Sequence, residues 1–385
     1  MKLEDACTVF IDGDWIESKG QSNIGIRLIQ TGNIGIGEYL EKDNKAKYVS
    51  EDTFENLKCT EVFPGDILIS RLPEPVGRAC IIPYKDERMI TAVDCTICRP
   101  NEEKVLKEYL CYFMQSTAYY NQLVNSLAGT TRKRISRKNL GKIEIRIPNK
   151  SIQTKVITNL DLVTKLIRLK KEELSIYNDL VKSRFIEIFG DPIINDKGWP
   201  KDKLKNHADV IVGYPFASSQ YTADGLPIVG GYNLMQGFVQ WENSKFWPSP
   251  EGYEQYLLKD KDIVIAMDRP WVGSGFKIAI IEKADLPAIL IQRTACIRCK
   301  DIPTQFLYRL LDSAWFADHC QITGSLVPHI SNKDILNYEI IVPPLDLQNQ
   351  FADFVALTDK SKLAVQQSIE TLQMLKAKLM QDYFG

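Results

Sequence analysis

Residues 129–148 read GTTRKRISRKNLGKIEIRIP, and residues 324–344 read GSLVPHISNKDILNYEIIVPP. A glycine opens each stretch, an Ile-Ser pair follows six residues later, and a proline closes it, so that matched residues lie 195 positions apart. A solenoid repeats every 20 to 50 residues or so, which is far less. The pattern therefore indicates that a whole domain occurs twice in the chain.

The repeat extends upstream of these two stretches. GDILIS, which contains Asp66, resembles KDIVIA, which contains Asp262. Residues 26–34 (IRLIQTGNI) likewise resemble residues 226–234 (LPIVGGYNL). These apolar runs have the strand-like character that leads into Gly-containing turns, and short amphipathic segments follow them. The sequence therefore predicts two related domains of α+β class.

After each closing proline the apolar residues adopt a helical spacing. From Ser151 to about Ile188, and again from Leu347 onward, they recur every three or four residues with no Gly or Pro inside. A seam of this period is typical of coiled coils, so we expect two long helices that pair antiparallel. The alternative is an amphipathic helix lying on a globular core. The predicted seam residues are Val156, Val163, Ile167, Leu174, Tyr177, Phe351, Val365, Ile369, Leu372 and Leu379.

These patterns together predict the organisation of the chain. We expect an α+β protein with two pseudo-repeated globular domains, each followed by a long helix, and the two helices paired as an antiparallel coiled coil. The globular domains are placed at residues 1–148 and 193–343, and the helical segments at residues 149–192 and 344–385.

Composition limits the class of protein. The chain has 385 residues, a net charge of −1, 44% hydrophobic and 25% charged residues, as in ordinary globular proteins. No uncharged apolar run is long enough to cross a membrane, and the first residues do not form a signal peptide, so we expect a cytoplasmic protein without membrane contact. Because the net charge is close to zero, any affinity for nucleic acid must come from local patches.

Nine cysteines are expected to be reduced thiols. Cys95 and Cys98, and Cys296 and Cys299, have the spacing of zinc ligands. Each pair lies in a strand-like run without Gly or Pro, however, and residues three apart in a strand face opposite sides. We therefore expect core cysteines and no metal site.

The chain carries little that resembles catalytic equipment. It has no phosphate-binding loop of the G-x-x-x-x-G-K-[ST] type, no Asn/Asp-Pro-Pro-Phe/Tyr stretch of an amino-methyltransferase, and only three histidines, without metal-ligand spacing. We therefore expect no catalytic residues and no cofactor bound by this chain.

Binding features are richer. Six basic residues and no acidic one occur between Thr130 and Lys142, in a loop that we expect to lead into a short turn and the strand KIEIRIP. A basic loop on a rigid domain suits phosphate contact, and its arginines suit guanine edges, although charge runs are also common on solvated loops. In the second copy, LVPHISNKDI replaces the basic residues. The predicted DNA-binding residues are Arg132, Lys133, Arg134, Arg137, Lys138, Gln30, Asn33 and Arg71 in the first copy, and Tyr232, Asn233, Arg269, Trp271 and His329 in the second.

The doubled order of motifs resembles the specificity subunits of type I restriction–modification systems. The likeness rests on Gly-[Thr/Ser]-x-x-x-x-Ile-Ser, a strand ending in Ile/Val-Pro and a long heptad helix, each occurring twice, and spans nearly the whole chain. FPGDILIS at 63–70 and FGDP at 189–192 fit the same family.

This resemblance implies a non-catalytic DNA-recognition subunit. It implies that each globular domain reads one half of a bipartite, asymmetric site in double-stranded DNA, and that the paired helices dock methyltransferase subunits, two of them, with a restriction and translocase subunit where the system has one. S-adenosylmethionine, and ATP with magnesium, would then be bound by those partners. The alternative is a coiled-coil scaffold protein that binds other proteins without reading DNA.

Overall fold

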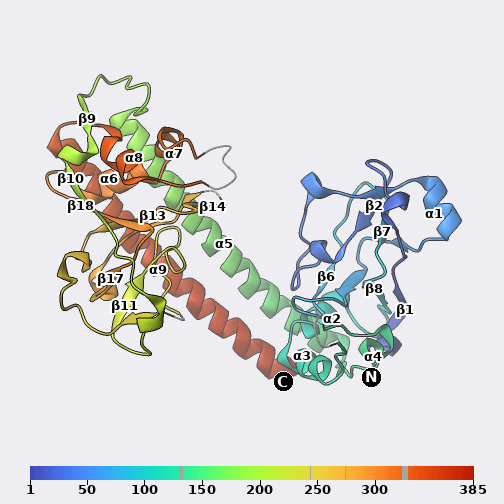
Figure 1. The fold of residues 1–385 in the computed structure, drawn as a ribbon. Coiled ribbons are helices and arrows are strands. Elements are labelled where there is room, and N and C mark those ends of the chain that lie inside the picture. Colours follow the sequence, from blue (N-terminus) through green and yellow to red (C-terminus); the bar gives the residue numbers. More distant parts are fainter. Residues whose placement is uncertain (130–132, 243, 274, 323–327) are drawn as a thin grey trace. The chain divides into compact units, whose positions relative to one another are not determined.

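The computed structural model describes residues 1–385 except 130–132, 243, 274 and 323–327. The chain divides into two compact units (Figure 1): unit 1 comprises Met1–Lys171 and Gln367–Gly385, and unit 2 comprises Glu172–Gln366. Each unit contains one globular α+β domain and part of two long helices, α5 (Lys150–Phe189) and α9 (Leu345–Phe384). The predicted α+β class and the repeat of globular domain and helix are confirmed.

Two four-stranded sheets form the globular domain of unit 1. The first has the order β1-β8-β5-β6 and is antiparallel throughout. The second has the order β3-β2-β7-β4, with β2 and β7 parallel. The strands are β1 (Cys7–Asp12), β2 (Ile26–Ile29), β3 (Tyr48–Val49), β4 (Glu61–Val62), β5 (Ile67–Ser70), β6 (Ala79–Ile81), β7 (Met89–Thr91) and β8 (Cys95–Pro100), and the helices are α1 (Glu51–Leu57), α2 (Lys107–Phe113), α3 (Thr117–Val124) and α4 (Arg137–Gly141).

Unit 2 repeats this plan. Its antiparallel sheet has the order β10-β18-β13-β16, and a second sheet has the order β12-β11-β17 with β11 and β17 parallel. A hairpin (β14-β15) and a two-stranded sheet (β19-β9) are added. The strands are β9 (Lys201–Lys203), β10 (Ala208–Val212), β11 (Leu226–Val229), β12 (Phe246–Trp247), β13 (Ile263–Ala266), β14 (Trp271–Val272), β15 (Gly275–Phe276), β16 (Ile278–Ile280), β17 (Ile289–Leu290), β18 (Thr294–Cys299) and β19 (Glu339–Ile341), and the helices are α6 (Thr304–Leu311), α7 (Ala314–His319) and α8 (Asn332–Asn337).

The repeated Ile-Ser pair is a buried anchor followed by a helix start. Ser136 and Ser331 are the N-caps of α4 and α8, and each hydroxyl accepts a hydrogen bond at 3.2 Å from the main-chain N–H three residues later, in Asn139 and Asp334. Ile135 and Ile330, just before them, are fully buried. The motif therefore fixes where this segment leaves the core.

A buried ion pair is also present in both copies. Arg99 donates to both carboxylate oxygens of Asp66, at 2.7 and 2.8 Å, and Arg298 does the same to Asp262, at 2.8 and 2.6 Å. Each carboxylate also accepts a main-chain N–H, from Phe63 in one copy and from Lys259 in the other. Such bidentate pairs fix the planes of both groups, so the aspartates that identified the repeat hold its central strands in place.

The two long helices are antiparallel. In unit 1 the beginning of α5 meets the end of α9, where Asn159 Nδ2 donates to the Tyr383 hydroxyl at 2.7 Å. In unit 2 the end of α5 meets the beginning of α9, where the rings of Phe185 and Phe351 lie 5.4 Å apart. The helices lie side by side in each unit (Figure 1), as the heptad seam predicted. Of the predicted seam residues, Val156, Val163, Phe351, Val365 and Ile369 are buried, and Ile167, Leu174, Tyr177, Leu372 and Leu379 are half-buried.

One predicted element is wrong. KIEIRIP does not form a strand, because among the described residues it pairs only with residues 1–3. Lys2 forms an isolated bridge with Glu144, and Met1 and Ile145 exchange main-chain hydrogen bonds. No described helix is long and apolar enough to span a membrane.

Candidate nucleic-acid interface

The basic segment of unit 1 is closed at its base by main-chain hydrogen bonds. Ala128 and Arg134 exchange main-chain hydrogen bonds at 2.9 Å, and the N–H of Ile135 donates to the carbonyl of Arg71 at 3.3 Å. Arg132, one of the predicted DNA-binding residues, lies outside the described residues. Lys133 and Arg134 are exposed on the loop. Arg137 and Lys138 are exposed in α4, so these two are helical, not part of the loop.

No ion pair among the described residues joins these exposed cations to an acidic side chain. Among the described residues, no carboxylate lies within ion-pair distance of Lys133, Arg134, Arg137 or Lys138. Unpaired Lys and Arg side chains on a protein surface are free to replace the counterions of a polyanion. This corner of unit 1, formed by residues 133–138 and called the basic corner below, is therefore suited to phosphate contact.

Arg71 has a different role from the one predicted. Its guanidinium donates to the carbonyls of Val93, at 2.5 Å, and Ile135, at 3.5 Å, and forms an ion pair with Asp12, at 3.3 Å. The side chain is mostly buried. Because its donors are used within the domain, Arg71 braces the basic corner from beneath and is not free to reach a base.

The two predicted asparagines are also structural. Asn33 and Asn233 are buried, at 6% and 3% exposure. Each side-chain oxygen accepts a main-chain N–H three residues earlier, from Gln30 and Gly230, at 3.1 and 2.9 Å. Both Nδ2 groups donate to nearby carbonyls. The asparagines thus shape the turn that follows β2 and β11, while Gln30 is half-buried at the start of that turn.

The matching corner of unit 2 is built differently. His329 occupies the position of Arg134, and its Nδ1 lies 2.5 Å from Asp268 Oδ1. Arg293 Nη1 lies 3.1 Å from the other oxygen of the same carboxylate. All three side chains are at least a third exposed. The second corner therefore offers a mixed set of donors and acceptors, in contrast to the free cations of unit 1. His329 was predicted from the sequence but Asp268 and Arg293 were not, because the three are brought together only by the fold.

The remaining predicted residues of unit 2 lie at separate points. Arg269 is exposed, and its N–H donates to the carbonyl of Pro328 at 3.0 Å, beside His329. Trp271 is half-buried, packs on Phe276 at 4.9 Å and donates its indole N–H to the Gly273 carbonyl at 2.9 Å. Tyr232 is partly exposed, with Lys245 Nζ 5.0 Å from its ring centre. Arg269 and His329 are thus neighbours, while Trp271 lies in β14 and Tyr232 in the turn after β11.

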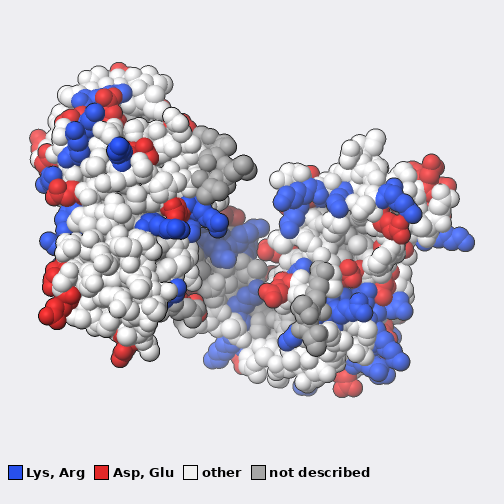
Figure 2. All heavy atoms as spheres, in the orientation of Figure 1, with Lys and Arg blue, Asp and Glu red and all other residues white. Residues whose placement is uncertain are grey.

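Surface charge differs between the units. The face of unit 2 over β11 and β17 is largely free of charged side chains in Figure 2, whereas the face of unit 1 carries many Lys and Arg side chains with Asp and Glu among them. A phosphate-tracking surface needs such basic groups. The two units therefore present different chemistry on a repeated scaffold.

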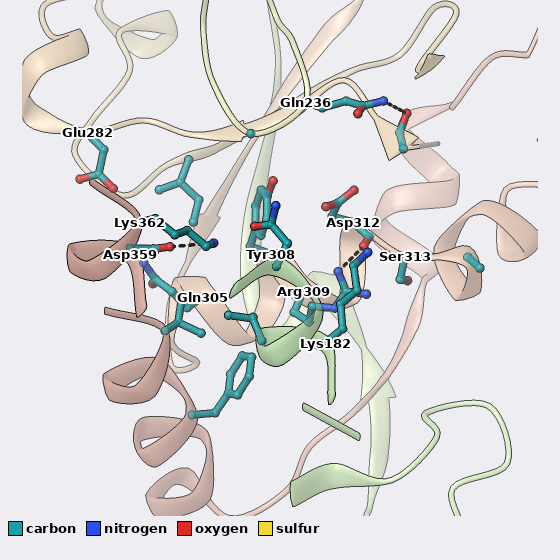
Figure 3. Close-up of a pocket in the computed structure, with 18 of the residues that line it drawn as sticks. Lys182, Gln236, Glu282, Gln305, Tyr308, Arg309, Asp312, Ser313, Asp359 and Lys362 are labelled. Atoms are coloured by element: carbon teal, nitrogen blue, oxygen red, sulfur yellow. Dashed lines mark hydrogen bonds and ion pairs between the residues drawn. The ribbon is translucent and has the colours of Figure 1, made fainter. Parts of the chain in front are cut away.

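Unit 2 also contains a cavity of about 920 Å³ between α6 and its parts of α5 and α9 (Figure 3). On its wall Arg309 donates to the Asp312 main-chain carbonyl at 3.0 Å. Burial lowers the pKa of the Arg309 guanidinium and raises the pKa of the Asp312 carboxyl. Lys182, Glu282, Asp359 and Lys362 also line the cavity. Because both signs of charge are present, the cavity has no evident preference for phosphate.

The cysteine pairs lie in strands, as predicted. Cys95 and Cys98 are both in β8 but belong to two different hydrophobic clusters, and the same is true of Cys296 and Cys299 in β18. Their thiols therefore point to opposite faces of the sheet. Within the described residues, no three His, Cys, Asp or Glu side chains are grouped as metal ligands would be.

Comparison with known proteins identifies the repeat. The model of the type I restriction modification DNA specificity domain matches residues 1–176 and again residues 195–373. The MjaVIII specificity subunit of Methanocaldococcus jannaschii is 27% identical over 290 residues, which are 71% of this chain and 68% of that protein. The EcoAI specificity subunit of Escherichia coli is 32% identical over 169 residues, which are 43% of this chain and 28% of that protein.

Solved structures share the fold. The crystal structure of an S subunit from M. genitalium has a TM-score of 0.55 at 13% identity, covering 100% of this chain and 95% of that one. A chain from a type I R-M system has a TM-score of 0.60 at 18% identity, covering 100% and 96%. With two matched domains, the same strand order in both and a paired long helix after each, the chain belongs to the type I restriction–modification DNA specificity family, as a specificity subunit with two target-recognition domains.

Proposed function

We propose that each unit reads one half of a bipartite, asymmetric site in double-stranded DNA. The observation that carries the proposal is that the scaffold repeats while the exposed corner does not. A serine caps the equivalent helix in each copy (Ser136 and Ser331), and an aspartate binds an arginine in each copy (Asp66 and Asp262). The exposed residue directly before the repeated Ile-Ser pair is Arg134 in one copy and His329 in the other. Readers of different sequences need this combination of constant support and variable contact.

The two corners favour different modes of contact. The basic corner of unit 1 suits phosphate oxygens, and an arginine there suits the O6 and N7 acceptors of guanine. The corner of unit 2 has Asp268, an acceptor for an amino group of a base, together with Arg293 and His329 as donors. Arg269 lies at the same corner.

The helices are proposed to dock the methyltransferase subunits. Large apolar side chains on both helices stay exposed in spite of the buried seam, among them Leu162, Ile176, Leu357, Leu363 and Met374. Exposed apolar groups in such number on paired helices are typical of a protein interface. Because the pattern of globular domain and helix occurs twice, we expect two methyltransferase subunits.

In this proposal the chain performs no chemical step. The partners bind S-adenosylmethionine and, where a restriction subunit is present, ATP with magnesium. The support is that the sequence lacks both the phosphate-binding loop and the methyltransferase motif. Methyl transfer by the purified chain alone would contradict this part of the proposal.

The test is selection from a pool of randomised duplexes. The full chain with its methyltransferase subunits should enrich two short blocks of defined sequence separated by a spacer of any sequence. A single continuous block would contradict the two-reader proposal. Binding of methyltransferase subunits without any base preference would instead favour a scaffold protein that does not read DNA.

A further inference from the structure

Arg78 is a buried arginine whose partners are all main-chain carbonyls. It lies at the start of β6 and is 8% exposed. Its Nε donates to Ile34 at 2.7 Å and its Nη2 to Thr31 at 2.8 Å. Its Nη1 donates to Leu72 at 2.9 Å and Pro75 at 3.1 Å. Among the described residues, no carboxylate shares this guanidinium.

The four carbonyls belong to two loops that are distant in sequence. Thr31 and Ile34 lie in the loop that follows β2, here the β2 loop (residues 30–40). Leu72 and Pro75 lie in the loop between β5 and β6, here the β5 loop (residues 71–78). The β5 loop begins at Arg71, which bonds to Ile135 at the base of the basic corner. Arg78 therefore joins two loops, one of which abuts the proposed DNA-contacting surface.

Burying a guanidinium without a carboxylate partner lowers the stability of the fold unless hydrogen bonds compensate. A buried cation without a counter-ion is unfavourable, and here burial lowers the pKa of the Arg78 guanidinium. The planar fork of arginine has five donors in fixed directions, and four hydrogen bonds to carbonyls satisfy most of them. Those four bonds also fix where the main chain of both loops lies. An aliphatic side chain could fill the same space but could not fix the loops.

The second copy shows a weaker version of the same device. Lys277 occupies the equivalent position, because its carbonyl accepts the N–H of Ala266 as the Arg78 carbonyl accepts that of Ser70. Lys277 Nζ donates to Gly231, the counterpart of Thr31, at 2.9 Å. A lysine ammonium cannot reach two loops in the planar geometry of a guanidinium. The loops of unit 2 are therefore joined by fewer bonds.

We propose that Arg78 is a positioning residue that fixes the β2 and β5 loops of unit 1 and, through Arg71 at the start of the β5 loop, the base of the basic corner that is proposed to contact DNA. The inference rests on the proposed function. It adds that base discrimination in one half-site depends on a side chain that touches no DNA.

The first measurement needs no DNA. Hydrogen exchange of the full chain is compared for the unaltered protein, Arg78→Lys and Arg78→Met, with Arg146→Met as a control because Arg146 is exposed elsewhere in unit 1. Main-chain exchange in residues 30–40 and 71–78 should be about tenfold faster in Arg78→Met and intermediate in Arg78→Lys, since local opening sets exchange. Exchange in β1 and β8 of unit 1 should not change, which reports that the domain carrying the substitution is folded, and exchange in unit 2 should not change either.

The second measurement is the selection from randomised duplexes with methyltransferase subunits present. In Arg78→Met, one block should lose base preference by about tenfold at its affected positions, while the other block keeps its preference. The salt dependence of binding should stay the same because the cations of the basic corner are untouched. Arg78→Lys should restore part of the preference.

The outcomes separate the inference from the proposed function. Unchanged exchange in Arg78→Met, or faster exchange with full base preference in both blocks, would overturn the positioning role. Failure of the unaltered chain to select any sequence would overturn the proposed function, and this is visible before any variant is examined.

Discussion

At the residue scale, the basic corner gives a direct prediction. Changing Arg132, Lys133 and Arg134 to Gln should weaken DNA binding and reduce the slope of log K against log salt by up to about 3, one for each lost phosphate contact. The measurement is a salt titration of binding to one duplex. A matched control changes Lys201, Lys203 and Lys205, which are exposed in unit 2. An equal fall in slope for both triple variants would mean that only overall charge matters.

At the corner of unit 2, we expect the removal of a charge to strengthen DNA binding, not weaken it. Asp268 brings negative charge beside His329 and Arg293. Asp268→Asn should therefore raise DNA affinity and steepen its salt dependence, while base preference in one block weakens. Asp209→Asn is the control, because Asp209 forms an exposed ion pair with Lys300 on the same unit, at 2.7 Å. Asp268→Asn that leaves both affinity and preference unchanged would remove this corner from the interface.

At the element scale, neighbouring residues of α5 separate stability from docking. Val163 is 5% exposed and Leu162 is 58% exposed. Val163→Asp places an unpaired charge in the seam and should lower the free energy of unfolding by several kcal/mol. Leu162→Asp should change it by less than about 0.5 kcal/mol but reduce recovery of methyltransferase subunits with the chain. Urea unfolding measures the stability, and co-purification measures the binding of methyltransferase subunits. If both variants still bound these subunits, docking on this helix would be refuted.

The repeated ion pair predicts equal effects in the two domains. Asp66→Asn and Asp262→Asn each leave a partly buried arginine without its carboxylate, so each should cost about 3 kcal/mol in its own unit. Glu17→Gln, in an exposed pair with Lys19, should cost less than about 1 kcal/mol. Urea unfolding followed by circular dichroism compares the three. A cost in only one of the two aspartate variants would mean that the repeated geometry is not equally important in both copies.

Elements and their repetition were predictable because their signals are local. The helix seam, the Ile-Ser pair and the matched aspartates are patterns within short windows of sequence, and the structure places all of them as scaffold. The side-chain roles were less predictable. Asn33, Asn233 and Arg71 were predicted to bind DNA, but main-chain carbonyls of their own domains accept hydrogen bonds from their side chains. Asp268 and Arg78 were missed, since their partners lie in loops distant in sequence.

At the scale of the whole molecule, the two-reader proposal predicts that specificity is modular. Replacing residues 195–342 with the equivalent domain of another specificity subunit should change one block of the recognised sequence and leave the other intact. Sequencing of methylated sites in cells carrying the hybrid and its methyltransferase measures both blocks. The unaltered chain in the same cells is the control. A hybrid that changes both blocks would mean that the domains do not read independently.

Unit 1 is discontinuous, since residues 367–385 complete a domain that begins at Met1. The ring of Phe384 packs on Tyr109, at 5.2 Å, in its core. During vectorial synthesis on the ribosome, the first domain made therefore lacks one wall until residues 367–385 have emerged. Unit 2 is one continuous segment of the chain, so all of its residues are made before those that complete unit 1. The domain translated second can thus mature first, and a chain released early would display an unfinished aromatic surface to chaperones and proteases.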